Sequence, residues 1–377
     1  MLPWHEIRTQ LQAYSLKRRQ ALEQRGRLKQ VIERVWNEIF PEQWQALRQR
    51  SAEERGSLLP DFHEAPCRLR SVTGHDEPAV VVASDGSQIF PSQHEIAPVA
   101  LISVSRIRLN YADPTDEPIL STEGKLLTEP PVDTGAEEQG PRFEDQVSDQ
   151  RAITELGTLA DLAQAARKQT APVFAMVDGS LILWRLAGRE DRAYERQIIN
   201  AYVERLAQFQ QIGTPVCGYI SGSGSRELVK LVEFAARYAQ ISNEPLTGYT
   251  DAALLTAFMQ PGERTPLFES RSKILSAYGD QRVGYFYLHA GEEIAKIEAP
   301  LWVGKNEAWL NALAAQCVDQ AHLGGGYPVI LAEAHEQAVI RGPDREMFYA
   351  LLEESLLEAG LTPQRSIKQL RKRVGIL

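Results

Sequence analysis

Two Asp-Gly-Ser triplets follow short apolar runs in this chain, and they are the residues best suited to chemistry. Asp85 follows such a run within residues 79–90, and Asp178 follows another within residues 174–184. Asp-Gly alone is a turn signal, so a single triplet predicts only a strand end or a hairpin. Two triplets that each continue into an apolar segment instead predict carboxylates at the ends of two central strands.

If those strands are neighbours, both carboxylates meet at one edge of the sheet. Close carboxylates repel each other unless a cation or a proton lies between them, and Mn²⁺ and Mg²⁺ favour carboxylate oxygens. Glu155, in the helical stretch before the second triplet, is the expected third acid, with Glu144 and Asp161 as alternatives. The serines are expected either to cap the following helix or to hydrogen-bond a carboxylate.

The segment GGGYPVILAEAHEQAVI, residues 324–340, carries a histidine at helical spacing from a tyrosine. Pro328 suits the first turn of a helix. Tyr327, Leu331 and His335 then lie four residues apart and point to roughly one side. A histidine in such a place is commonly a core residue, but it can also ligate a metal ion or carry a proton.

The small residues GSGS, at 222–225, raise two other possibilities. A serine hydrolase needs a nucleophile elbow with a spaced His and acid, and that context is missing. A P-loop ends in Lys-Ser or Lys-Thr, which this segment lacks. The sequence shows no motif for nucleotide hydrolysis, so energy for movement along a polymer would have to come from a partner.

The charge of the chain is unevenly distributed. Its 377 residues carry a net charge of −9, and residues 112–150 contain eleven acids against two bases, together with five prolines. This segment therefore accounts for the whole net charge and is expected to include an exposed acidic loop. The remainder is balanced and has basic ends, so net charge does not exclude a nucleic-acid partner.

The cysteine and hydropathy patterns limit the environment of the protein. Cys67, Cys217 and Cys317 are odd in number and far apart, which argues against a disulfide framework or a zinc cluster. The sequence has no apolar run of the ~18–20 residues that a membrane span needs, and its N-terminus lacks the features of a secretory signal. These observations predict a cytoplasmic protein with no membrane partner.

Periodicity and punctuation predict the elements that position these residues. Residues 4–56 are expected to form two helices that meet near Pro41. Strands are expected at 79–83, 99–111, 118–127, 173–177, 215–220, 283–289 and 293–303. Further helices are expected at 144–169, 181–212, 226–240, 249–259, 307–321, 328–340 and 343–359. A meander that changes to alternating helix and strand predicts an α/β fold with a mixed sheet flanked by helices.

Taken in order, these features resemble the NurA family of DNA-repair nucleases. The resemblance rests on the two triplets, Glu155, and the stretch YPVILAEAHEQAVI, supported by GYISGSGSREL, YTDAALLTAFMQPGERTPLF and KIEAPLW. It covers residues 80–358. The family implies a ribonuclease-H-like fold, Mn²⁺-dependent digestion of DNA (with Mg²⁺ as a possible substitute), a homodimer, and partnership with a hexameric HerA-type ATPase.

The resemblance also implies roles for individual residues. Asp85, Glu155, Asp178, Tyr327 and His335 match the family's catalytic set, and Asp85, Asp178 and His335 are the expected metal ligands. The implied activity is 5′-to-3′ exonuclease digestion in the resection of double-strand breaks, with possible endonuclease activity. The alternative is a non-catalytic DNA-binding adaptor that loads a ring ATPase.

One position departs from the family pattern. Ser221 stands where the family often has a lysine, and the nearest bases, Arg226 and Lys230, become the expected contacts to nucleic acid. Residues 1–60 are expected to be a helical N-terminal extension. Residues 61–377 are expected to be the ribonuclease-H-like nuclease domain, with its acidic loop at about 112–150.

Overall fold

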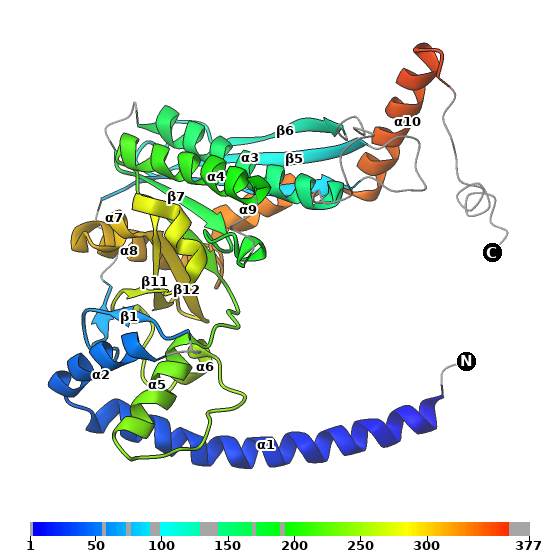
Figure 1. Ribbon diagram of the computed structural model, residues 1–377. Coiled ribbons are helices and arrows are strands. Elements are labelled where there is room, and N and C mark those ends of the chain that lie inside the picture. The colour runs from blue at the N-terminus through cyan, green and yellow to red at the C-terminus, as the bar shows by residue number, and fades with distance from the viewer. Residues whose placement is uncertain are drawn as a thin grey trace.

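The structure is a computed structural model that describes residues 3–54, 58–72, 77–90, 99–128, 142–167, 171–188 and 193–361. One mixed sheet runs through it (Figure 1). From edge to edge the main strand order is β1 (Asp61–Phe62), β10 (Phe268–Glu269), β11 (Val283–His289), β12 (Ile294–Pro300), β8 (Val216–Ile220), β7 (Val173–Asp178), β3 (Val80–Ser84), β5 (Val99–Asn110) and β4 (Gly86–Ile89). Off this path, β6 (Ile119–Thr128) pairs with β5, and β2 (Arg70–Ser71) pairs with β9 (Glu263–Arg264).

The centre of the sheet is parallel. β3 pairs parallel with β7, and β7 pairs parallel with β8, whereas β5 and β12 flank them antiparallel. Every residue of β3 is buried, as expected of a strand covered on both faces. Because side chains alternate along a strand, Val80 and Val82 pack into one core, and Val81 and Ala83 pack into another.

Helices cover both faces of this centre. The first face packs against α3 (Phe143–Ala166) and α4 (Ala193–Ile212), which lie side by side in Figure 1. The opposite face packs against α8 (Glu307–Leu323) and α9 (Val329–Ala338), with the short α7 (Leu301–Gly304) nearby. The 3₁₀ segments η1 (Trp184–Leu186) and η2 (Lys273–Gln281) complete the first core.

A separate core forms around the β1 end of the sheet. It joins α1 (Trp4–Glu38), α2 (Pro41–Glu53), α5 (Glu227–Tyr238) and α6 (Asp251–Leu255). Only the C-terminal part of α1 enters this core, and its N-terminal half extends away from the body (Figure 1). At the other end of the molecule α10 (Gly342–Glu358) projects outward, and none of its side chains is buried.

The predicted mixed α/β sheet, its flanking helices and the helix break at Pro41 are confirmed. The predicted helix over 181–212 is wrong at its start. Leu181 and Ile182 turn into the core instead, Gly188 has a left-handed backbone with φ 85°, and α4 begins only at Ala193. These long-range contacts override the local helical periodicity.

Several other predicted boundaries extend too far. α3 ends at Ala166, α6 ends at Leu255, and β12 ends at Pro300, after which residues 301–304 form α7. Proline has no amide hydrogen for a sheet ladder and suits the start of a helix, so Pro300 explains the last change. Most of the expected acidic loop, residues 129–141, and the basic tail from residue 362 lie outside the described residues.

Candidate active site

The pairing of β3 with β7 places two carboxylates at one sheet edge. Ser84 lies opposite Val177 in this parallel pair, so Asp85 and Asp178 occupy equivalent places one residue further along. Neighbouring strands in a sheet lie about 4.8 Å apart. The register therefore brings the two Asp-Gly-Ser triplets together, as their sequence context predicted.

The first triplet is not a turn. β3 and β4 both pair with β5, and their registers are continuous across Asp85. The amide of Asp85 donates to Ser105 Oγ at 3.0 Å, and the amide of Ser105 donates to the Asp85 carbonyl at 2.8 Å. Asp85 therefore interrupts one long strand, where the pairing with β7 stops and only the pairing with β5 continues.

Gly86 is small because Glu155 occupies the space beside it. A Cβ atom on Gly86 would lie 2.2 Å from Glu155 Oε1, which no side chain can tolerate without movement. The Ser84 hydroxyl also donates to the Glu155 carbonyl at 2.8 Å and ties α3 to β3. The competing acids Glu144 and Asp161 are exposed, so Glu155 is the acid of α3 that lies at this edge.

The second triplet is a true turn. Gly179 has φ 98°, which favours glycine, and its amide donates to the Tyr219 carbonyl at 2.8 Å. The Ser180 hydroxyl donates to Glu298 Oε2 at 2.7 Å, and the Leu181 amide donates to the same oxygen at 3.0 Å. Ser180 therefore binds a buried carboxylate, which answers the question left open for this serine.

The serine of the first triplet has a different partner. Ser87 donates its hydroxyl to the carbonyl of Ala338, the last residue of α9. Thr122 of β6 donates to the neighbouring Gln337 carbonyl at 3.0 Å. Neither serine caps a following helix; instead, Ser87 and Thr122 together fix the helix that carries His335.

His335 reaches the first carboxylate directly. Its Nδ1 lies 3.0 Å from Asp85 Oδ2, and its side chain is 64% exposed. Tyr327, just before α9, hydrogen-bonds through its hydroxyl to Asp178 and packs edge-on against Tyr219 at a centroid distance of 5.7 Å. One helix and its N-terminal loop thus contact both triplets, whereas the four-residue spacing predicted only that these side chains point to one side.

Two acids at this edge, Glu155 and Asp178, have raised pKa values. Burial raises the pKa of Glu155 to about 8, Arg151 opposes this, and Asp85 and Asp178 add to it. Burial also raises the pKa of Asp178, against the Tyr327 hydrogen bond, while Asp85 raises it further. The pKa of Tyr327 is raised by burial and by Asp178. This edge thus holds an excess of negative charge in a partly desolvated place.

The donor set fits a hard divalent cation. Among the described residues, no three His, Cys, Asp or Glu side chains are arranged so that they could already hold a metal ion. However, Glu155 Oε1 is buried without a hydrogen-bond partner, and Arg151 Nε lies 3.1 Å away without the alignment of a hydrogen bond. A cation between the carboxylates would relieve their repulsion, and carboxylate and imidazole ligands suit Mn²⁺.

The predicted nucleic-acid contacts lie apart from this cluster. Arg226 Nη2 donates to the Leu246 carbonyl at 3.0 Å and lies 3.5 Å from Glu233, so it is engaged within the fold. Lys230 follows on α5, whose buried side chains pack in the core shared with α1 and α2. The structure therefore does not bring either base to the carboxylates.

Two acids at this end of the sheet escaped sequence reasoning. Glu293 accepts from Tyr219 Oη at 3.0 Å, from Ser221 Oγ at 2.7 Å and from the Gly222 amide at 3.2 Å. It therefore fixes the loop at Ser221, the position that departs from the expected pattern. Glu298 supports the second triplet and is fully buried. The charged Lys296 and Glu298 inside the otherwise apolar run of β12 were the available signal.

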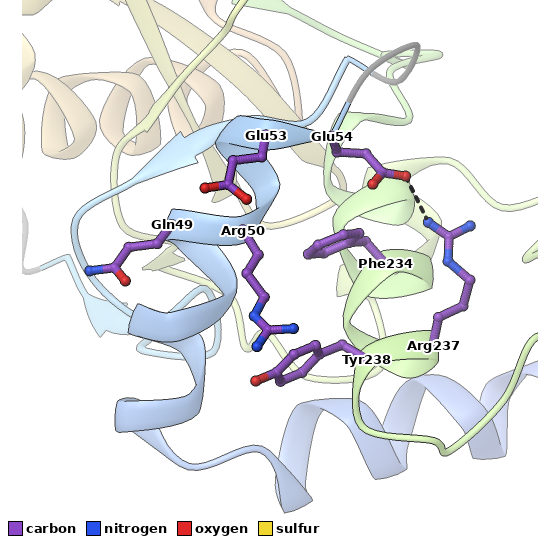
Figure 2. Close-up of a pocket in the computed structure, with 7 residues that line it drawn as sticks. All are labelled: Gln49, Arg50, Glu53, Glu54, Phe234, Arg237 and Tyr238. Atoms are coloured by element: carbon purple, nitrogen blue, oxygen red, sulfur yellow. Dashed lines mark ion pairs between the residues drawn. The ribbon is translucent and has the colours of Figure 1, made fainter.

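A cavity of about 790 Å³ lies elsewhere, between α2 and α5. Figure 2 shows Arg50 against the Tyr238 ring and the ion pair between Arg237 and Glu54. None of the predicted site residues lines it. Ser223, from the GSGS stretch, accepts only the Ser225 amide among the described hydrogen bonds, which gives no support to a serine hydrolase.

The mixed sheet and the acids at the ends of its parallel strands define a ribonuclease-H-like α/β protein. The NurA domain family matches residues 79–340, and the chain belongs to that family. Its fold is similar to the crystal structure of the NurA nuclease from Sulfolobus solfataricus, with a TM-score of 0.50 and 14% identity over 90% of this chain and 96% of that one. No curated protein matches the chain.

Proposed function

We propose that the protein is a metal-dependent deoxyribonuclease. The observation that carries this proposal is the in-register placement of Asp85 and Asp178 at one sheet edge, with Glu155 beside Gly86 and His335 against Asp85. Closely placed acids that repel one another are typical of sites that bind a cation or hold a proton. Membership of the NurA family supports a nuclease, and we infer phosphodiester bonds of DNA as the substrate.

Each residue has a distinct part in the proposed reaction. Asp85, Asp178 and His335 would hold Mn²⁺, with Mg²⁺ as a substitute, and the bound metal would supply Lewis-acid stabilisation of the phosphate and activation of water. Glu155 would accept or return a proton near the phosphate, since its burial favours the protonated carboxyl group. Tyr327 orients Asp178 through its hydroxyl.

The finer activity is inferred from the resemblance to the family. We infer 5′-to-3′ exonuclease digestion of single- and double-stranded DNA during end resection, with some endonuclease activity. We also infer a homodimer that works with a HerA-type ring ATPase. Residues 1–60 would be a helical extension, and residues 61–377 the nuclease domain, in which Arg226 and Lys230 would contact DNA away from the carboxylates.

A nuclease assay on end-labelled DNA tests the proposal. Single- and double-stranded substrates, labelled at either end, are incubated with Mn²⁺, with Mg²⁺ or with EDTA. We expect cleavage with Mn²⁺, less with Mg²⁺, and none with EDTA, with products that shorten from the 5′ end. DNA binding without cleavage under every metal condition would instead support the adaptor that only loads an ATPase.

A further inference from the structure

An exposed indole lies beside the second Asp-Gly-Ser turn. Trp184 is 38% exposed, although it is a large apolar side chain. Its ring nitrogen does not depend on water for a partner, because Nε1 donates to Ser180 Oγ at 3.0 Å. Tryptophan at a surface is enriched where proteins bind ligands, since its ring combines apolar area with a polar handle.

The indole is held in place by buried groups. Ser180 Oγ, which accepts from Trp184, also accepts from the Ile182 amide at 3.0 Å and donates to Glu298. Glu298 is fully buried. Leu186, at the end of the same 3₁₀ segment, is buried in the core. A side chain ordered before binding loses less conformational freedom when a ligand arrives.

The backbone around the indole is ordered as well. The Leu183 amide donates to the Tyr278 hydroxyl at 2.9 Å, and the Trp184 amide donates to the Ile182 carbonyl at 2.8 Å. Ser180 lies only two residues after Asp178, so their Cα atoms are at most about 7 Å apart. The indole is therefore a fixed aromatic surface that is bonded to a residue two positions after Asp178.

The neighbouring cation, Arg185, is not free to bind a phosphate of the DNA. Arg185 is paired with the buried carboxylate of Asp149 and lies 3.6 Å from Asp145. Its cation is therefore neutralised within the fold. Among the described residues 181–188, the feature that remains available to a nucleic acid is the aromatic surface of Trp184, and every base has a flat face that can stack on it.

We propose that Trp184 is a stacking platform for a base of single-stranded DNA next to the carboxylate cluster. This inference rests on the proposed nuclease function. Stacking of one base on an aromatic side chain stabilises a complex regardless of sequence. Trp184 would thereby hold one nucleotide of the strand while a neighbouring phosphate lies against Asp85 and Asp178. Glu298 would act as a positioning residue for Trp184 and for the turn after Asp178, because it binds Ser180.

Binding in EDTA tests the platform without cleavage. The probes are a fluorescein-labelled thymidine oligonucleotide and an abasic strand of equal length, which has the phosphates and no bases. We expect the protein to prefer the thymidine strand, and we expect W184A to weaken that binding by roughly tenfold while binding to the abasic strand is unchanged. W184F should retain most of the affinity. Y238A is the matched control, since Tyr238 is also 38% exposed but lies in the cavity of Figure 2.

The outcomes separate the platform from other roles. Equal affinity of W184A and the parent protein for the thymidine strand would overturn it, as would equal losses on both strands. If W184A unfolds, tryptophan fluorescence provides a second test. The fluorescence of Trp184 is the difference between the parent protein and W184F. This difference must change when the thymidine strand is added, or the platform is excluded. Nuclease activity of the parent protein is assayed in parallel. A base preference that depends on Trp184, without cleavage in any metal, would contradict the proposed nuclease activity and still support the stacking platform.

Discussion

At the scale of single residues, the site depends on contacts that leave little room for change. Asp85 is held by Ser105 through the backbone and faces His335 through its carboxylate. Glu155 fills the space that a side chain at position 86 would need. His335 is different, because its ring is mostly exposed, and its loss removes no core packing.

His335→Ala should therefore reduce activity without reducing stability. A metal ligand or proton carrier of this kind contributes about 10²–10⁴-fold to the rate, while an exposed side chain contributes little to folding. Tyr327→Phe should cost less, since it removes only the hydrogen bond to Asp178. Single-turnover rates and melting temperatures are measured on the same preparations. A normal rate in stable His335→Ala would remove His335 from the site.

Gly86→Ala should impair activity more than stability. The new methyl group would displace the Glu155 carboxylate, and a shift of about 1 Å at a catalytic group can cost roughly 10²-fold in rate. Gly224→Ala is the control, because a Cβ at Gly224 meets nothing within 4 Å. Turnover with Mn²⁺ and the midpoint of urea unfolding decide the matter. Full activity in Gly86→Ala would show that the position of Glu155 is not critical.

At the scale of elements, the site is assembled by junctions between neighbours. α3 is tied to β3 by Ser84, α9 is tied to β4 by Ser87, and the turn after β7 is tied to β12 by Glu298. Another junction, far from the carboxylates, joins α2 to β1. There Arg48 donates two hydrogen bonds to Asp61, and Arg271 lies 3.2 Å from the same carboxylate.

The Asp61 junction should make stability depend on pH. The hydrogen bond from Arg48 holds the pKa of Asp61 at about 2, below its usual value of 3.8. The folded state favours the ionised acid, so the contribution is complete above the unfolded pKa and is lost as pH falls toward 2. After allowance for partial exposure, it is on the order of 1–2 kcal/mol at neutral pH.

Urea unfolding at pH 7 and near pH 2 measures this contribution. Asp61→Asn should lower the free energy of unfolding at pH 7, and its deficit should shrink at the lower pH. Glu204→Gln, at an exposed position on α4, should behave like the parent protein at both. A deficit of the same size at the two pH values would mean that ionisation of Asp61 does not support the junction.

Much of this arrangement could be predicted from the sequence. The apolar runs before Asp85 and Asp178 predicted two buried strands that each end in a carboxylate, and the helical spacing of Tyr327 and His335 predicted a shared face. That the two strands are neighbours was a condition of the prediction, and the register of β3 and β7 fulfils it. What could not be predicted are contacts between residues far apart in the chain. Glu298 accepts a hydrogen bond from a serine 118 positions away. It also accepts one from the Leu181 amide, at a position where local periodicity favoured the start of a helix.

At the scale of the whole molecule, two helices extend from the body with uncovered apolar side chains. α1 exposes Trp4, Leu11, Tyr14 and Leu16, and α10 exposes Met347, Leu351 and Leu357. No described helix is long and apolar enough to cross a membrane. Projecting helices with exposed apolar residues are typical of surfaces that bind another protein.

The proposed homodimer predicts a mass of about twice the 42.2 kDa of one chain in sedimentation equilibrium. Adding a HerA-type ATPase from the same source should shift the boundary to a larger complex. Leu351→Lys, in the middle of α10, tests whether this helix takes part. It should weaken the homodimer or the complex with the ATPase, since a charge in an apolar interface is costly. A monomer that does not respond to the ATPase would contradict both proposed partnerships.

The most direct test of the central claim is cleavage by Asp85→Asn and Asp178→Asn. Each change preserves the shape of the side chain and removes one charge from the proposed metal site. Asp161→Asn, on the exposed side of α3, is the matched control. We expect both site variants to remain folded and to lose Mn²⁺-dependent cleavage of end-labelled DNA by more than about 10²-fold, while the control cleaves normally. Parental cleavage rates in folded Asp85→Asn or Asp178→Asn would contradict the assignment of this sheet edge as the active site.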